Sequence, residues 1–229
     1  MQRIQLWDLP SRLFHWSLAL LVCGAIITGK IGGGAMVWHG RIGIALVGLL
    51  VFRLIWGFVG STYARFAQFM PTPASLCAYL RGQWRGLGHN PFGAISVLGL
   101  LALLAALLAT GLAGNDDIAF RGPLFDLVSK DVSDRLIGWH RLLTNALFAL
   151  IALHLAAIAF YTHVRKDNLV RPMITGYKDV TPGIGEPARG GGLIAALIAL
   201  LIAAAAAYAA SGAWLPPPPP PAPSSTPAW

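Results

Sequence analysis

The chain has 229 residues, of which 56% are hydrophobic and only 11% are charged, and its formal net charge is +8. A soluble domain is usually about 25% charged, so this composition cannot cover a water-facing surface and lipid must solvate much of the chain. The basic residues lie in loops between apolar stretches, as the orientation of membrane proteins requires. The positive charge therefore indicates a membrane protein and no nucleic-acid partner.

Five apolar stretches approach or exceed the roughly 17–25 residues that span a bilayer. In lipid the backbone polar groups must be paired internally, so long stretches without alternation are predicted to be helices and not strands. We expect an all-α integral membrane protein, a four-helix bundle followed by a fifth C-terminal transmembrane helix. The expected spans are residues 13–29, 37–59, 92–114, 136–164 and 193–215.

Composition also divides the chain into segments. A stretch rich in glycine is expected to form a flexible linker before the fifth span, and the run of prolines from position 216 favours an extended, solvated tail. Thr72 followed by Pro73 is typical of the start of a helix, so a short interfacial helix is expected there. The expected division is a membrane domain of residues 1–178, a linker of 179–192, an additional transmembrane helix of 193–215 and a proline-rich tail of 216–229.

The charges of the loops predict an orientation. Arginines and lysines precede the first span and lie between the second and third and between the fourth and fifth, whereas the connection between the third and fourth spans is rich in aspartate. Because basic loops stay inside, the N-terminus is expected in the cytoplasm and the C-terminus outside.

Two histidines of the fourth span, His140 and His154, are fourteen residues apart. That spacing separates them by about 21 Å along a helix and returns them to within roughly 40° of the same face. From the predicted orientation, His15 lies at the depth of His154 and His39 at the depth of His140. Each pair suits a six-coordinate haem with two axial imidazoles, which favours electron transfer over oxygen binding. The chain has no C-x-x-C-H sequence, so such a haem would be held by coordination alone.

Arg53 lies fourteen residues after His39 on the second span and therefore shares its face, about 21 Å further in. An arginine cannot shed its charge, and a haem propionate is a suitable counter-ion. We expect Arg53 beside the inner haem. An arginine that extends to lipid headgroups is the alternative interpretation.

The histidines allow other interpretations. Any single one could be a polar residue of the membrane interface. A carboxylate-rich dimetal site would need acidic residues at one level, and a proton-relay transporter usually has broken helices and carboxylates at the midplane. His89 is expected to be a loop or cap residue and His163 an interfacial residue.

Several short motifs resemble the bacterial cytochrome b561 family, which is related to the cytochrome b subunits of membrane-bound nickel-iron hydrogenases. The resemblance covers most of the first 178 residues, and each motif is weak alone but specific in combination. The motifs are Trp7-Asp8-Leu9-Pro10-Ser11-Arg12-Leu13-Phe14-His15-Trp16, Trp38-His39, the stretch from Phe52 to Gly60, Tyr63-Ala64-Arg65-Phe66, Gly88-His89-Asn90-Pro91 and the stretch from Asn168 to Gly176.

The resemblance implies a four-helix bundle in a bacterial inner membrane with two haem b groups. Family ligands carry over to His15 and His154 for one haem and to His39 and His140 for the other. It also implies exchange of electrons with membrane quinone and with a periplasmic partner, either a c-type cytochrome or a hydrogenase. Whether a quinone stays bound to the protein is left open. The fifth span and the proline-rich tail depart from the short members of the family.

The expected function is therefore that of an electron-transfer subunit that links the quinone pool to a periplasmic redox protein. Two alternatives stay open. One is a stand-alone enzyme, a superoxide:quinone oxidoreductase, and the other is a haem-bearing sensor or anchor subunit.

Overall fold

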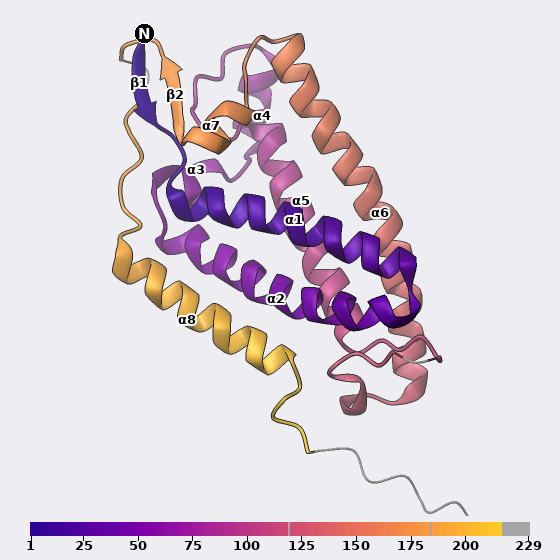
Figure 1. The fold of residues 1–229 in the computed structure, drawn as a ribbon. Helices are drawn as coiled ribbons and strands as arrows, with labels where there is room; N and C mark the ends of the chain where they lie inside the picture. The colour runs from indigo at the N-terminus through magenta and orange to yellow at the C-terminus, as the bar shows by residue number, and fades with distance from the viewer. Residues whose placement is uncertain (119, 184, 217–229) are drawn as a thin grey trace, which may run out of the picture.

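A computed structural model describes residues 1–118, 120–183 and 185–216. Five of its helices are long and apolar enough to cross a membrane, which confirms the expected all-α membrane bundle with a fifth C-terminal helix (Figure 1). The expected tail falls almost wholly outside the described residues. The five long helices are α1 (Leu9–Ile31), α2 (Met36–Val59), α5 (Pro91–Leu112), α6 (Lys130–His163) and α8 (Leu193–Ala210).

Side-chain caps explain where three of these helices begin. Asp8 accepts a hydrogen bond from the Ser11 amide, and Asn90 and Ser129 play the same part for α5 and α6. Such caps satisfy amides that have no partner in the first helical turn. Because of the Ser129 cap, α6 starts two turns before the apolar stretch predicted from position 136. In contrast, α8 ends at Ala210, before the predicted limit of 215.

Shorter elements connect the long helices. The predicted interfacial helix is present as α4, and it begins with a capping box in which Thr72 and Ser75 each bond the other's backbone. The remaining short elements are η1 (Gly33–Ala35), η2 (Thr62–Ala64), α3 (Phe66–Phe69), α4 (Pro73–Leu80), η3 (Phe125–Leu127) and α7 (Val170–Thr175).

A two-stranded sheet, which the sequence did not predict, joins the beginning of the chain to the segment after the fourth span. Strand β1 (Gln2–Gln5) pairs antiparallel with β2 (Tyr177–Val180), with Gln2 opposite Val180. Gly176 accepts backbone hydrogen bonds from Leu6 and Trp7 beside it. We call this end of the bundle the amino end, and the end that bears the α5–α6 connection the distal end (Figure 1).

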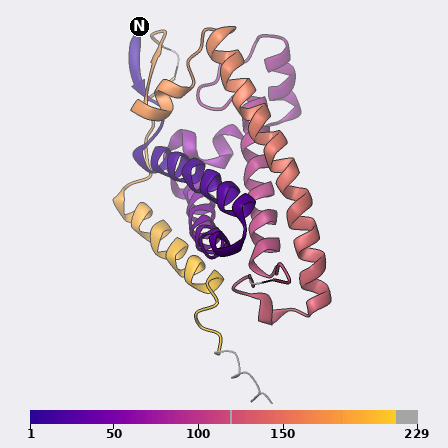
Figure 2. The same ribbon diagram turned by 45° about the vertical axis from the view of Figure 1, so that its right-hand side comes forward.

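Helix α2 lies at the centre of the bundle. It packs against α1, α5 and α8, whereas α6 packs mainly against α5. Figure 2 shows α8 on one side of α2 and α6 on the far side of α5. All four predicted haem ligands come from α1, α2 and α6.

The segment before α8, the predicted linker, makes backbone hydrogen bonds to two other parts of the chain. The Ala188 amide donates to the Gln5 carbonyl (2.8 Å), and the Thr62 amide donates to the Arg189 carbonyl (2.9 Å). Helix α8 then packs closely on α2, because a Cβ added at Gly48 would lie 3.4 Å from both the Ala203 carbonyl oxygen and the Ala207 Cβ. Small residues permit this approach of two membrane helices.

Candidate functional site

The histidines predicted at the distal end, His39 of α2 and His140 of α6, face each other. Their ring centroids are 6.1 Å apart and their planes are inclined by 81°. A metal–imidazole bond is about 2 Å long, and each ring nitrogen lies roughly 1 Å from the centre of its ring. The ring centroids of two axial imidazoles on one metal ion are therefore about 6 Å apart. The spacing of this distal pair therefore fits one metal ion between the two rings.

Each ring of the distal pair is oriented by a backbone carbonyl. His39 Nδ1 lies 2.9 Å from the Ala25 carbonyl oxygen, and His140 Nδ1 lies 2.9 Å from the Leu107 carbonyl oxygen. A carbonyl can only accept a hydrogen bond, so Nδ1 carries the proton and Nε2 keeps its lone pair. This arrangement is the usual support for a histidine that binds a metal through Nε2.

A cavity of about 570 Å³ surrounds the distal pair, with walls from α1, α2, α5 and α6. Glycines provide its clearance. A Cβ added at Gly29 would lie 3.1 Å from the His39 ring, and one added at Gly111 would lie 3.0 Å from the His140 ring. Gly43 also lines the cavity and has open space where a side chain would be. The cavity is mostly apolar, as a site for a large flat macrocycle should be.

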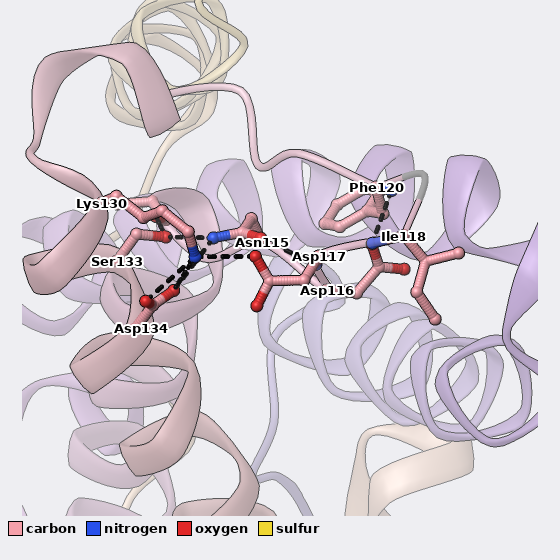
Figure 3. Close-up of polar contacts among 9 residues, drawn as sticks. Asn115, Asp116, Asp117, Ile118, Phe120, Lys130, Ser133 and Asp134 are labelled. Atoms are coloured by element: carbon pink, nitrogen blue, oxygen red, sulfur yellow. Dashed lines mark hydrogen bonds and ion pairs between the residues drawn. The ribbon is translucent and has the colours of Figure 1, made fainter.

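The α5–α6 connection covers the distal end of the cavity. Its residues Asp116, Ile118 and Phe120 line the cavity, and the Phe120 ring lies against Gly40. Two backbone amides, those of Ile118 and Phe120, donate to the Asp116 carboxylate at 3.0 and 2.8 Å (Figure 3). These bonds shape the loop at the distal end of the cavity.

A second set of polar contacts fastens this loop to α6. Asn115 Nδ2 donates to Ser133 Oγ (3.1 Å), and Ser133 Oγ donates to the Ala113 carbonyl (2.7 Å). Both side chains are buried. Figure 3 shows the Lys130 ammonium between the carboxylates of Asp117 (2.8 Å) and Asp134 (3.0 Å), but these groups are exposed. The buried Asn115–Ser133 contact is expected to contribute more than the exposed ion pairs.

The histidines predicted at the amino end are His15 of α1 and His154 of α6. Both are half-buried. His15 Nδ1 is buried and has no hydrogen-bond partner among the described residues. An unpartnered polar atom on a predicted ligand fits a site that is completed by a bound group.

Arg53 of α2 belongs to this amino-end region and is only 6% exposed, so it does not extend to lipid headgroups. Its guanidinium carbon lies 4.8 Å from the Phe66 ring centroid and 5.9 Å from that of Phe69. Its Nη1 is buried without a hydrogen-bond partner among the described residues. Asp8, the carboxylate that acts on Arg53, is already bonded to the Trp56 indole (3.0 Å).

His89, which the sequence suggested was a loop or cap residue, lies in this same region. Its ring is between Trp7 (4.9 Å between centroids) and Phe69 (4.6 Å). Asn90 and not His89 caps α5. Burial, and next the positive charge of Arg53, lower the pKa of His89 to about 3, so the free ring is neutral at physiological pH.

The sequence around His89 predicted the start of a helix but not the burial of the histidine. The Gly88-His89-Asn90-Pro91 motif marked the start of a helix, yet nothing in it indicated burial. The two rings that cover His89 come from segments that are distant in the chain. Only the packing of α3 and the N-terminal segment against this loop brings them together.

A pair of histidines on facing membrane helices, spaced for a single metal ion in an apolar cavity, is typical of haem-binding membrane cytochromes. Comparison with known families agrees, because the prokaryotic cytochrome b561 family matches residues 6–176. The chain belongs to this family. It is therefore a multi-pass membrane cytochrome of the b type, which binds haem b and transfers electrons.

Curated relatives include the probable Ni/Fe-hydrogenase 1 B-type cytochrome subunit of Escherichia coli strain K12 and that of Escherichia coli O157:H7. Each is 21% identical to the chain, and the match covers 75% of this chain and 89% of the relative. No solved structure matches the chain significantly.

Proposed function

We propose that this cytochrome holds two haem b groups, one between His39 and His140 and one between His15 and His154, and passes electrons across the bacterial inner membrane. The observation that carries the proposal is the geometry of the distal pair, whose 6.1 Å separation and carbonyl-bonded Nδ1 atoms suit axial ligation. The amino-end pair is supported by the unpartnered His15 Nδ1 and by the matched depths of His15 and His154 along their helices.

The residues would perform distinct parts in this function. The imidazoles would fill both axial positions, which favours electron transfer over oxygen binding. The Ala25 and Leu107 carbonyls would hold the distal rings in the ligating tautomer, and the α5–α6 connection would limit contact with water. Because His140 and His154 lie about 21 Å apart along α6, the haems would occupy the two leaflets.

The proposed orientation has the amino end in the cytoplasm and the distal end in the periplasm, from the charges of the loops. The proposed electron partners are membrane quinone and a periplasmic redox protein. Similarity to the hydrogenase cytochrome subunits favours a hydrogenase over a c-type cytochrome as the second partner. Arg53 is proposed to lie beside the inner haem.

The test of this function has two measurements. A pyridine haemochrome assay on fully loaded, purified protein should give two haems per chain, and a ratio near one would remove one histidine pair. Purification in mild detergent should then recover a hydrogenase with the cytochrome. Recovery of a c-type cytochrome would show that the partner is not a hydrogenase. Superoxide-dependent reduction of the isolated protein would favour a superoxide:quinone oxidoreductase.

A further inference from the structure

Buried donors without partners are concentrated at the amino end. Among the described residues, all buried side-chain nitrogen and oxygen atoms that have no hydrogen-bond partner belong to residues of this end: Arg12, His15, Arg53, Ser61, Arg65, His89 and Thr162. Burying such a group without a partner costs about 1–3 kcal/mol. Native proteins keep few of them, and each needs an explanation. Most of these groups are cations or N–H donors, so the missing partner is an acceptor, most simply an anion.

No protein carboxylate fills this need. Arg53 forms no ion pair or hydrogen bond within the part of the chain that the structure describes, although its charge is buried. Asp8, whose charge acts on Arg53, makes its hydrogen bonds to other donors: one oxygen accepts from the Ser11 amide (2.7 Å) and the other from the Trp56 indole (3.0 Å). A buried arginine without a counter-ion is costly, so an anion from outside the chain is required.

His89 lies on the same side of this region as Arg53. Both side chains lie beside the Phe69 ring: the His89 and Phe69 ring centroids are 4.6 Å apart, and the Arg53 guanidinium carbon is 5.9 Å from the Phe69 centroid. The shared Phe69 contact places His89 and Arg53 in one aromatic cluster at the amino end of the bundle. A haem contributes two carboxylates, its propionates, and these are the anions that the cofactor would bring to this region.

We propose that His89 donates a hydrogen bond to a propionate of the haem held by His15 and His154, with Arg53 as the counter-ion of the same carboxylate. This inference rests on the proposed function, because it requires the inner haem. His89 is therefore a positioning residue for the cofactor, not an iron ligand. Its aromatic neighbours Trp7 and Phe69 fix the ring plane, and a neutral imidazole keeps one N–H for donation.

A role in packing alone does not explain His89. A phenylalanine would fill the space between Trp7 and Phe69 equally well without an unpartnered nitrogen. An imidazole in an apolar environment normally finds an acceptor, and within the described residues the Nδ1 of His89 has none. The ring is therefore better explained by an acceptor that the chain does not supply.

The test compares His89→Phe, which keeps the aromatic packing and removes the donor, with His89→Gln, which keeps a donor. His163→Phe is the matched control, since His163 is an exposed histidine at the end of α6 near this region. The readouts are a redox titration that resolves both haems, the propionate bands of the resonance Raman spectrum, and the rate of haem transfer to a soluble haem scavenger. The Raman bands are also compared in H₂O and D₂O for the unaltered protein.

In His89→Phe, the inner haem should titrate at lower potential, its propionate band should shift, and it should leave about tenfold faster, as loss of a hydrogen bond to a charged group predicts. His89→Gln and His163→Phe should match the unaltered protein. The inference is overturned if His89→Phe retains both haems with unchanged inner potential and propionate band, or if His89→Gln shows the same changes as His89→Phe.

Two further outcomes are also decisive. If His89→Phe does not fold, the unaltered protein still tests the idea, because a propionate band without a D₂O shift excludes the hydrogen bond. If the unaltered protein contains only the distal haem, the proposed function fails first, and the haem count identifies that failure separately.

Discussion

The rings of His39 and His140 lie opposite each other with their centroids 6.1 Å apart, and each Nδ1 is 2.9 Å from a backbone carbonyl oxygen of another helix. His39 is oriented by Ala25 of α1 and His140 by Leu107 of α5. All four helices of the bundle therefore contribute to one site. Displacing any of them should change the ligand geometry, and this makes the site sensitive to small substitutions.

The pairing of ligands predicts which substitutions are equivalent. Both His39→Ala and His140→Ala should remove the distal haem, and both His15→Ala and His154→Ala should remove the other, because a haem that loses one axial imidazole is held by a single coordinate bond. Haem content and low-temperature absorption spectra measure this. Identical spectral losses in the His15 and His140 variants would contradict the pairing.

The clearance at Gly111 gives a finer prediction. In Gly111→Ala, the new methyl group would meet the His140 ring at 3.0 Å, so the ring must shift by a few tenths of an ångström and weaken its bond to the Leu107 carbonyl. We expect reduced loading or a lower thermal stability of the distal haem, on the order of 1 kcal/mol. Gly99→Ala on the same helix is the control, since a Cβ there meets nothing within 4 Å. Equal behaviour of the two variants would mean that Gly111 provides no needed space.

The loop over the distal pair offers a comparison between buried and exposed contacts. Asn115→Ala leaves Ser133 with an unsatisfied buried hydroxyl lone pair and removes the acceptor of the Asp117 amide. We expect the loop to be destabilised by about 1–3 kcal/mol. Lys130→Met removes only exposed ion pairs and should cost less than about 1 kcal/mol. Hydrogen exchange of the α5–α6 connection measures the loss of stability in both variants. A larger loss in Lys130→Met would mean that the exposed ion pairs stabilise the loop more than the buried Asn115 contacts.

The long helices were predictable because hydropathy and length are local properties. The depths of four histidines were predicted from helical rise and loop charge alone, and the ring centroids of two of them, His39 and His140, lie 6.1 Å apart. The limits of the helices were less accurate, since capping by Ser129 starts α6 in a polar stretch that hydropathy ignores.

What the sequence did not predict depends on contacts between distant segments. Strands β1 and β2 have four residues each and no hydrophobic alternation, so only their pairing identifies them. The linker looked flexible from its glycines, but Thr62 and Gln5 bind its backbone. The burial of His89 likewise arises from Trp7 and Phe69.

The orientation can be tested with single cysteines. The two native cysteines, Cys23 and Cys77, are both exposed and must first be replaced by serine. In that background, Ser225→Cys in the tail should react with a membrane-impermeant maleimide in spheroplasts, whereas Gln83→Cys in the basic loop should react only after lysis, because basic loops stay inside. Labelling of Gln83→Cys in intact spheroplasts would invert the topology and exchange the depths of the two haems.

Arg53 should raise the reduction potential of the inner haem. Its buried positive charge, which has no ion pair within the described chain, stabilises the electron added to the iron. A unit charge about 10 Å from the iron interacts by about 1.7 kcal/mol at an effective dielectric constant of about 20, which corresponds to roughly 70 mV for one electron. Arg53→Leu should therefore lower the inner potential by tens of millivolts and leave the distal haem unchanged. Arg53→Lys, which keeps the charge, is the matched control and should retain most of the potential. The measurement is a redox titration that resolves both haems. If both haems are retained and the inner potential does not move, or only the distal potential shifts, Arg53 does not act on the inner haem.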